Sequence, residues 1–251
     1  MTNARSAKST REKAAELRAE AERQAARRRM FTVGGAVLAV IVVLVGAVTL
    51  FRTLQKQQDD KVAAATAPPA NLTDGGILVG KGDAKVTIDL YEDFQCPACK
   101  AFEEADATML RKYATDGKVK LIYRPVAILD RFSTTEYSTR ALNALGVVVN
   151  ASPTSFLAFH DALFANQPPE NGDGLPDATL IDLAVKAGAS KAAIEAPITS
   201  GKYRGWVTKV TDEFTAKVAQ AGTPTVMING SQVKDLTPDK LKAEIDKAIA
   251  G

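Results

Sequence analysis

The chain has 251 residues, with 32 lysine and arginine side chains against 29 aspartate and glutamate, a length that allows one or two domains. Residues 1–29 hold nine basic and four acidic side chains, so the rest of the chain, with 23 basic and 25 acidic, is close to neutral. A near-neutral body lacks the basic face that binding to DNA or RNA requires, so we exclude nucleic acid as a partner.

The first predicted element is an uncharged, apolar segment. Residues 30–51 have Thr32 and Thr49 as their only polar side chains. A helix of this length spans about 33 Å, enough to cross a hydrocarbon core of about 30 Å. A cleavable signal peptide has a shorter apolar region, with a small-residue cleavage site close behind, whereas here the first such stretch, AAATA, begins at residue 63. We therefore predict one transmembrane helix at 30–52 that is retained as an anchor.

The charges that flank this segment predict its orientation. Arginines are concentrated before it, and the positive-inside bias then keeps residues 1–29 in the cytoplasm as a basic tail. Everything after residue 52 would lie outside the cytoplasm, in a compartment where disulfides persist. Residues 53–75 contain QKQQDD and most of APPANLTDGG, which is the composition of a linker.

The folded domain, predicted at 76–251, begins with two strands. The runs at 77–80 and 85–91 are apolar and β-branched and are bounded by glycine and aspartate, as strands are. A helix is expected from Pro97 to the TDGK turn, followed by a strand at 119–126. We expect the buried stripe of this helix to consist of Ala101, Phe102, Ala105, Met109 and Tyr113.

The rest of the domain is predicted to be mainly helical before it returns to strands. Residues 134–166 are expected to be helical throughout, and further helices are expected at 177–188, 190–199 and 203–220. A strand at 224–230, a partner at 231–236 and a helix at 238–250 close the chain. A strand–helix–strand crossover implies parallel pairing, whereas a hairpin implies antiparallel pairing. We therefore predict an α/β fold with one mixed sheet flanked by helices and a helical insertion at about 133–220.

The two cysteines, Cys96 and Cys99, lie three positions apart in FQCPACKAF. A structural zinc site needs four ligands, and the sequence adds a single histidine to this pair, so we expect no metal site. A structural disulfide stabilises mainly by closing a long loop, which this spacing does not provide. A chain of this size also buries enough core without one. A redox-active pair is the stronger interpretation.

The position of the pair also favours redox chemistry. Cys96 follows a predicted strand and begins a predicted helix, where unpaired N–H groups and the helix dipole stabilise an anion. Cys99 lies one turn further along the same face. Because the thiolate is the nucleophile, we expect Cys96 to react with the partner and Cys99 to resolve the mixed disulfide. The pair would cycle through a Cys96–Cys99 disulfide and need no further cofactor.

The pattern F-x-C-P-x-C-x-x-F after a strand resembles the DsbA-like branch of the thioredoxin superfamily. Three segments, YEDFQCPACKAF, FHDALFANQP and GTPTVMING, are similar to family segments and occur in the expected order over about residues 76–250. The resemblance implies a thioredoxin-like fold, with a helical domain inserted where the helical block lies.

The resemblance also implies which residues support the cysteines. Thr223 and Pro224 would form a cis-proline loop that faces the CxxC. Pro97 and Ala98 separate the two cysteines, and Ala98 stands where strongly oxidising relatives have histidine. The sole histidine, His160, is expected to pack within the helical insertion.

One position departs from the family pattern. Many relatives have a buried acid six positions before the first cysteine, where it assists proton transfer, and here that residue is Leu90. Asp89 should point to the opposite face of its strand. Glu92 shares the side of Leu90 and lies nearer the CxxC, so it is the candidate for proton transfer.

These observations predict a membrane-anchored thiol:disulfide oxidoreductase that forms disulfides in exported, cysteine-containing proteins. The resemblance implies that a quinone-linked membrane oxidase reoxidises the CxxC. An alternative within the same fold is a disulfide reductase or isomerase. An alternative of another class is a membrane-tethered, chaperone-like module that binds peptides.

Overall fold

The computed structural model describes residues 44, 46, 49–53, 67–218 and 221–251. The predicted tail at 1–29, most of the predicted transmembrane helix at 30–52 and much of the predicted linker lie outside these residues. Within the described part of the chain, no helix has both the length and the apolar character needed to span a bilayer. The chain divides into two units, 1–60 and 61–251, and the second contains the folded domain.

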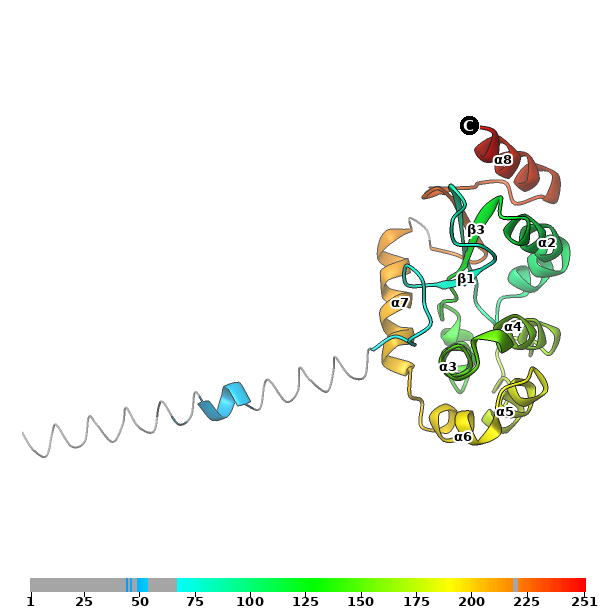
Figure 1. Cartoon of the computed structure of the whole chain (residues 1–251). Helices are drawn as coiled ribbons and strands as arrows, with labels where there is room; N and C mark the ends of the chain where they lie inside the picture. The colour runs from blue at the N-terminus through cyan, green and yellow to red at the C-terminus, as the bar shows by residue number, and fades with distance from the viewer. Residues whose placement is uncertain (1–43, 45, 47–48, 54–66, 219–220) are drawn as a thin grey trace, which may run out of the picture. The chain divides into compact units, whose positions relative to one another are not determined.

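The domain is built on a mixed, five-stranded sheet with the strand order β1-β3-β2-β4-β5 (Figure 1). The central strands β2 and β3 are parallel, and the remaining neighbours pair in antiparallel fashion. The parallel pair and the antiparallel hairpin at the end of the sheet confirm the predicted mixed sheet. The strands are β1 Ile77–Val79, β2 Val86–Tyr91, β3 Val119–Tyr123, β4 Thr225–Ile228 and β5 Ser231–Gln232.

Helices cover both faces of this sheet. The helix α2, Pro97–Thr115, forms the crossover between β2 and β3, and this connection is what makes the two strands parallel. In Figure 1, α7, Arg204–Lys217, lies on the opposite side of the sheet from α2. The last helix, α8, Pro238–Ala250, begins after Thr237 as predicted, and the Tyr113 hydroxyl of α2 donates a hydrogen bond to its Asp246.

A block of helices lies between β3 and β4. Its central helix is α3, whose buried residues span 137–149 and which contacts α4, α5, α6 and α7. The predicted helical stretch 134–166 is interrupted, because Glu136 adopts a left-handed conformation (φ 55°) before α3 and Ser152 leaves the helix before Pro153. The helices are α3 Tyr137–Ala151, α4 Phe156–Ala165, α5 Asp177–Lys186 and α6 Lys191–Thr199, with 3₁₀ turns at Asp130–Phe132 and Pro153–Ser155.

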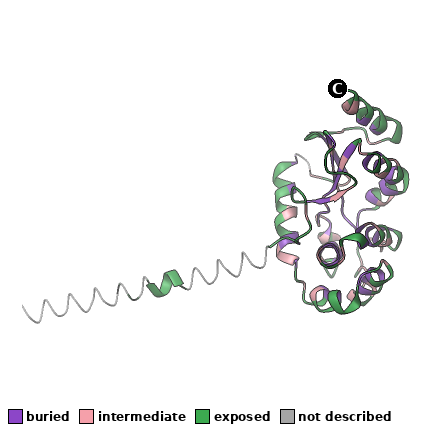
Figure 2. Cartoon of the chain, viewed as in Figure 1, coloured by how far each residue is buried: buried purple, intermediate pink, exposed green. Residues whose placement is uncertain are grey.

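The buried face of α2 differs from the predicted stripe. Ala101 and Ala105 are exposed, whereas the acidic residues Glu103 and Asp106 are buried. The buried face includes Glu103 because this residue has cationic partners inside the domain. Hydrophobic periodicity cannot predict such partners. Figure 2 shows burial concentrated on the strands and on α3. The buried residues of α2 are Cys99, Phe102, Glu103, Asp106, Ala107, Leu110, Tyr113 and Ala114.

Candidate functional site

Cys96 is the N-cap residue of α2, with extended backbone angles (φ −76°, ψ 114°) and Pro97 at the first turn. Proline is favoured there because its missing N–H would have no partner within the helix. The loop before it is held closely: the Cys96 N–H donates to the Asp93 carbonyl at 2.9 Å, and the Gln167 side chain donates to the Phe94 and Cys96 carbonyls at 3.0 and 2.9 Å. The backbone of Cys96 is therefore held both by its own loop and by the segment that follows α4.

The loop before β4 completes the site from the other side. The Thr223–Pro224 peptide bond is cis, as the resemblance implied. The Cys96 thiol donates to the Thr223 carbonyl oxygen across a Sγ···O distance of 3.3 Å, although the two residues are 127 positions apart. Among the described residues, the Thr223 hydroxyl is buried without a hydrogen-bond partner while Cys96 is a thiol, and it donates to the Cys96 sulfur once that sulfur is a thiolate.

The pKa values of the two thiols are shifted in opposite directions. A hydrogen bond from Cys99, together with bonds from Thr223 and from the backbone N–H groups of Cys99 and Ala98, lowers the pKa of the Cys96 thiol to about 6 against the effect of partial burial. Burial, the bond to Cys96 and the negative charge of Glu92 raise the pKa of Cys99. Near neutral pH the Cys96 sulfur is therefore mainly a thiolate, while Cys99 remains a thiol. Cys96 is 6% exposed and Cys99 0%, so Cys96 is the more accessible of the two.

The other predicted site residues divide between surface and interior. Pro97 and Ala98 are exposed above the cysteines. Glu92, in the loop after β2, is 0% exposed, and burial raises its pKa to about 8. Asp89 instead accepts a hydrogen bond from Arg124 at 2.5 Å, a partner away from the cysteines, as predicted, and Leu90 is fully buried.

His160 contacts Glu92, which the sequence interpretation missed. The histidine is fully buried within α4, as expected of a packing residue. Its Nε2, however, lies 3.2 Å from Glu92 Oε2. The only available signal was the occurrence of a single histidine in the chain, and no spacing rule connects positions 68 residues apart.

Asp93 is a second residue that sequence reasoning did not identify. Its carboxylate accepts hydrogen bonds from the Ser138 hydroxyl at 2.6 Å and from the backbone N–H groups of Gln95 and Leu129, each at 2.9 Å. Burial raises its pKa to about 6, and these hydrogen bonds oppose the shift. Asp93 thus fastens the loop that carries Cys96 to the helical insertion. Its position three residues before the CxxC was the available signal.

One buried cluster has the composition of a cation site. Glu92, Glu103 and His160 offer ligand atoms that lie within 4.8 Å of one another. The Arg111 guanidinium, however, donates to Glu103 Oε2 at 2.8 Å, and its positive charge opposes a cation at the same place. Arg111 is therefore the cationic partner of Glu103.

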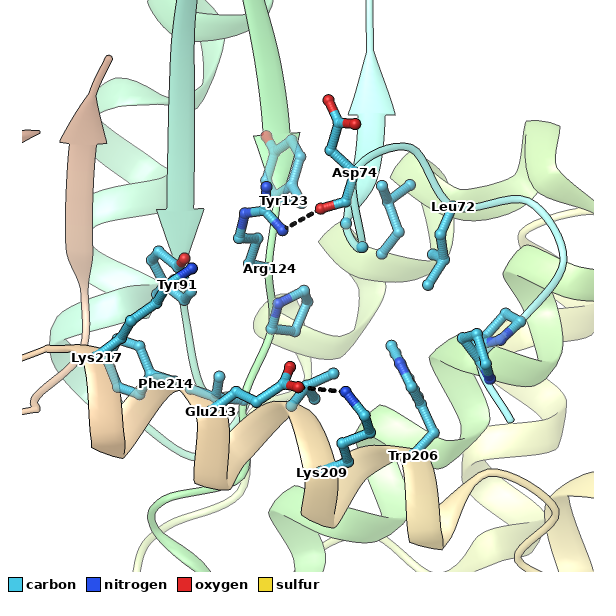
Figure 3. A pocket seen from close by; sticks show the side chains of 18 of the residues that line it. Leu72, Asp74, Tyr91, Tyr123, Arg124, Trp206, Lys209, Glu213, Phe214 and Lys217 are labelled. Atoms are coloured by element: carbon cyan, nitrogen blue, oxygen red, sulfur yellow. Dashed lines mark hydrogen bonds and ion pairs between the residues drawn. The ribbon is translucent and has the colours of Figure 1, made fainter. Parts of the chain in front are cut away.

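A groove of about 620 Å³ lies elsewhere on the domain, between α7 and the chain around residues 68–77 (Figure 3). We call it the α7 groove. Tyr91 stacks on Phe214 along it, with ring centroids 4.8 Å apart, and Arg124 donates to the Asp74 carbonyl oxygen at 2.7 Å. Cys96 and Cys99 are not among the described residues that line it. The groove could accept an apolar chain, but it is separate from the sulfurs.

Comparison with known proteins gives this arrangement a family. The family model described as thioredoxin matches residues 72–247. The chain belongs to the thioredoxin family. In this thioredoxin-family protein, the CxxC, the cis-proline loop and the N-terminus of α2 meet in one region.

Named relatives of this thioredoxin-family chain narrow the activity. Disulfide bond formation protein D of Bacillus subtilis is 28% identical over 180 residues, or 70% of this chain and 78% of that protein. The crystal structure of oxidised BdbD from Bacillus subtilis has a TM-score of 0.64 at 27% identity and covers 75% of this chain and 99% of that one. Reduced DsbA from Mycobacterium tuberculosis has a TM-score of 0.58 at 35% identity and covers 72% and 91%. The chain is a DsbA-like protein disulfide oxidoreductase.

Proposed function

We propose that Cys96 and Cys99 are the redox-active pair of this oxidoreductase and that its net reaction forms disulfides in exported proteins. The single observation that carries the proposal is the stabilised Cys96 sulfur, which is held against Thr223 at the helix N-terminus while Cys99 stays buried as a thiol. Stabilising the reduced form makes the corresponding disulfide more oxidising. This chemistry favours transfer of a disulfide to a substrate over reduction of one.

The reaction proceeds by two thiol–disulfide exchanges. A substrate thiolate attacks Cys96 of the Cys96–Cys99 disulfide, a mixed disulfide forms, and the Cys99 sulfur leaves and takes one proton. A second substrate thiolate then attacks the substrate sulfur of the mixed disulfide, and Cys96 leaves as a thiolate. The substrate has lost two electrons and the CxxC has gained them. The exposed Pro97–Ala98 surface and the Thr223–Pro224 loop would hold the substrate chain beside Cys96.

Glu92 is the group we assign to the Cys99 proton. Its charge acts on the Cys99 thiol, and its Oε1 is buried without a hydrogen-bond partner among the described residues. An acid whose pKa lies near neutrality can both give and accept a proton at working pH. In many relatives an acid at the position of Leu90 assists proton transfer, and here Glu92 would have that role.

The proposed setting is the outer face of a membrane. Support comes from the uncharged sequence at 30–51 and from the arginines before it, which predict an anchor at 30–52, a cytoplasmic tail at 1–29 and a linker at 53–75. The domain at 76–251 would then meet exported proteins as they arrive with free thiols. A quinone-linked membrane oxidase would accept electrons from the reduced CxxC and restore its disulfide.

The deciding experiment measures the direction of electron flow. Cells are quenched in acid and free thiols are alkylated, so that the in vivo redox state of Cys96 and Cys99 is trapped. We expect the disulfide to predominate, and we expect the purified chain, equilibrated with glutathione buffers, to have a potential more oxidising than about −200 mV. A reduced pair in cells, with a potential near that of thioredoxin at about −270 mV, would move the protein to the reductase or isomerase alternative.

A second measurement addresses the binding-module alternative. Replacing both Cys96 and Cys99 by serine removes the chemistry and leaves the α7 groove intact. We expect the double variant to lose its function in cells. A double variant that retained full function would instead favour a tethered peptide-binding module.

A further inference from the structure

Gln167 is a residue of the helical block that contacts the backbone of Cys96. Its side-chain amide donates to the Phe94 carbonyl at 3.0 Å and to the Cys96 carbonyl at 2.9 Å. A glutamine amide has two N–H donors, so both are engaged in these bonds. The whole donor capacity of the Gln167 side chain is therefore directed at the loop that presents the reactive sulfur.

The position of Gln167 is itself closely held. The residue lies just beyond the end of α4, and its backbone N–H donates to the Phe164 carbonyl at 3.1 Å. Pro168 follows it, and a following proline restricts a residue to extended backbone angles. The helix is anchored in the core, because Phe159 and Leu163 are fully buried. The amide thus reaches the Cys96 loop from a fixed point.

The Cys96 carbonyl oxygen has more donors than lone pairs. Besides Gln167, the backbone N–H groups of Cys99 and Lys100 donate to it, at 3.1 and 3.2 Å. A carbonyl oxygen has two lone pairs, so three donors share them, and the bond from Gln167 is the shortest of the three. The Cys99 N–H is also one of the groups that lower the pKa of the Cys96 thiol. One N–H is therefore divided between the oxygen and the sulfur of Cys96.

We propose that Gln167 is a positioning residue for the disulfide reaction, which occupies the Cys96 carbonyl and so leaves the Cys99 N–H available to the Cys96 thiolate. The inference rests on the proposed function of Cys96 and Cys99. Without Gln167, the carbonyl would hold the Cys99 N–H more strongly, and the thiolate would lose part of a hydrogen bond that favours its charged form. The helical block thereby contributes to the acidity of a cysteine that lies outside it.

This contribution acts at a defined step of the reaction. In the second exchange, a substrate thiolate attacks the substrate sulfur of the mixed disulfide, and Cys96 leaves as a thiolate. A thiol of lower pKa leaves faster, and a stabilised thiolate makes the Cys96–Cys99 disulfide more oxidising. Gln167 donates to carbonyl oxygens and not to a sulfur, so it takes part in this step only through the backbone.

The test measures the thiolate and the disulfide in the same protein. Titration of the reduced full chain between about pH 4 and 9, followed by the ultraviolet absorbance of the thiolate, gives the pKa of Cys96 as a midpoint. Equilibration with glutathione buffers at about pH 7 gives the equilibrium constant of the Cys96–Cys99 disulfide. Both quantities report on the same thiolate, so a variant that acts on it must change them together.

Gln167→Met removes both donors from a side chain of similar length. We expect the midpoint to rise from about 6 by about half to one pH unit. The equilibrium constant should move about two- to sixfold towards a less oxidising disulfide. Gln167→Lys retains donors and should leave the midpoint at or below that of the unaltered protein. If Gln167→Met fails to fold, the sign of the shift in Gln167→Ala decides, and this shift should be smaller because water can replace the amide.

The matched control is Asn166→Ala, which removes the neighbouring amide. The Asn166 side chain donates to the Ala162 carbonyl of its own helix at 2.8 Å, so neither quantity should change. The titratable groups that act on or contact the two sulfurs, Cys99, Glu92 and Asp93, are the same in every variant. Residues 221–224 of the loop before β4 carry no charge. A shifted midpoint therefore reports on hydrogen bonding.

The outcomes separate the proposal from its premise. A lower melting temperature of Gln167→Met with both quantities unchanged would mean that Gln167 only supports the fold, and would overturn the proposal. An equal shift in Asn166→Ala would overturn it as well. An unaltered protein that forms no reversible Cys96–Cys99 disulfide with glutathione would instead refute the proposed function itself.

Discussion

The Cys96 sulfur lies 3.3 Å from the carbonyl oxygen of Thr223, a residue 127 positions further along the chain. This contact joins the N-terminus of α2 to the loop before β4. The contact places the Cys96 sulfur beside the backbone that precedes β4. In the proposed reaction, an extended substrate chain pairs with this backbone.

The acidity of Cys96 is the first testable consequence. We expect its alkylation rate to follow a titration with a midpoint of about 6. Thr223→Val removes a hydroxyl that donates to the thiolate, so the midpoint should rise. Rates of iodoacetamide modification, measured by mass spectrometry from pH 4 to 9, would check this. The matched control is Thr225→Val, because the Thr225 hydroxyl donates to the Gly222 carbonyl and not to sulfur.

The two cysteines should differ in the complexes they trap. Cys99→Ser removes the resolving thiol, so mixed disulfides between Cys96 and substrates should accumulate. Cys96→Ser should trap almost none, because Cys99 is 0% exposed and its pKa is raised by burial. Non-reducing gels of cell extracts, probed for the protein, would show the difference. Faster alkylation of Cys99 than of Cys96 near neutral pH would reverse the assignment of roles.

Stability should fall as the pH rises above neutrality. Folding raises the pKa of Glu92 from 4.5 to about 8 and that of His160 from 6.5 to about 9. In both cases the folded state keeps a proton that the unfolded state releases, so stability is lost between about pH 4.5 and 9. Cys96 has the opposite effect on stability, because folding lowers its pKa. The measurement therefore uses a variant in which both cysteines are replaced, Cys96→Ser and Cys99→Ser.

In that background we expect the melting temperature to fall by at least about 3 °C between pH 6 and 9, equivalent to about 1 kcal/mol. Adding Glu92→Gln should flatten the curve, because glutamine stays neutral throughout. A curve as steep as that of the parent would show that Glu92 does not titrate in this window.

Removal of the Asp93 carboxylate should weaken the attachment of the CxxC loop. Asp93→Asn loses an acceptor for at least one of three hydrogen bonds, so unfolding should become easier by about 1–3 kcal/mol. Urea unfolding followed by circular dichroism would measure it. Asp116→Asn, in an exposed pair with Lys112, should change stability by less than about 0.5 kcal/mol. Equal effects of the two substitutions would contradict the role assigned to Asp93.

The predicted anchor is tested by topology. Protease added to cells freed of any outer barrier should digest the domain at 76–251 and spare a tag placed before Met1. This result follows if residues 30–52 cross the membrane with the arginines inside. A tag accessible from outside would overturn the orientation. Recovery of a soluble form that begins near Ala65 would establish cleavage instead.

The local features of the site were available from the sequence. Cys96 begins a helix because a β-branched run ends before it and Pro97 follows it, and both signals act within a few residues. The mixed sheet followed from the order of strands and helices, since a crossover helix dictates parallel pairing. The resemblance of GTPTVMING to family segments implied that Thr223 and Pro224 face the cysteines.

Tertiary structure alone decided which charged residues are buried and what they contact. Hydrophobic periodicity predicts that Glu103 and Asp106 are exposed, yet both are buried. Inside the domain, Glu103 is paired with Arg111 and lies close to His160. Burial of a charge is tolerated only where a partner offsets the loss of water, and that partner can come from any distance along the chain. The Glu92–His160 contact and the hydrogen bonds of Asp93 produce no periodic pattern in the sequence, because each depends on where α3 and α4 pack on the sheet.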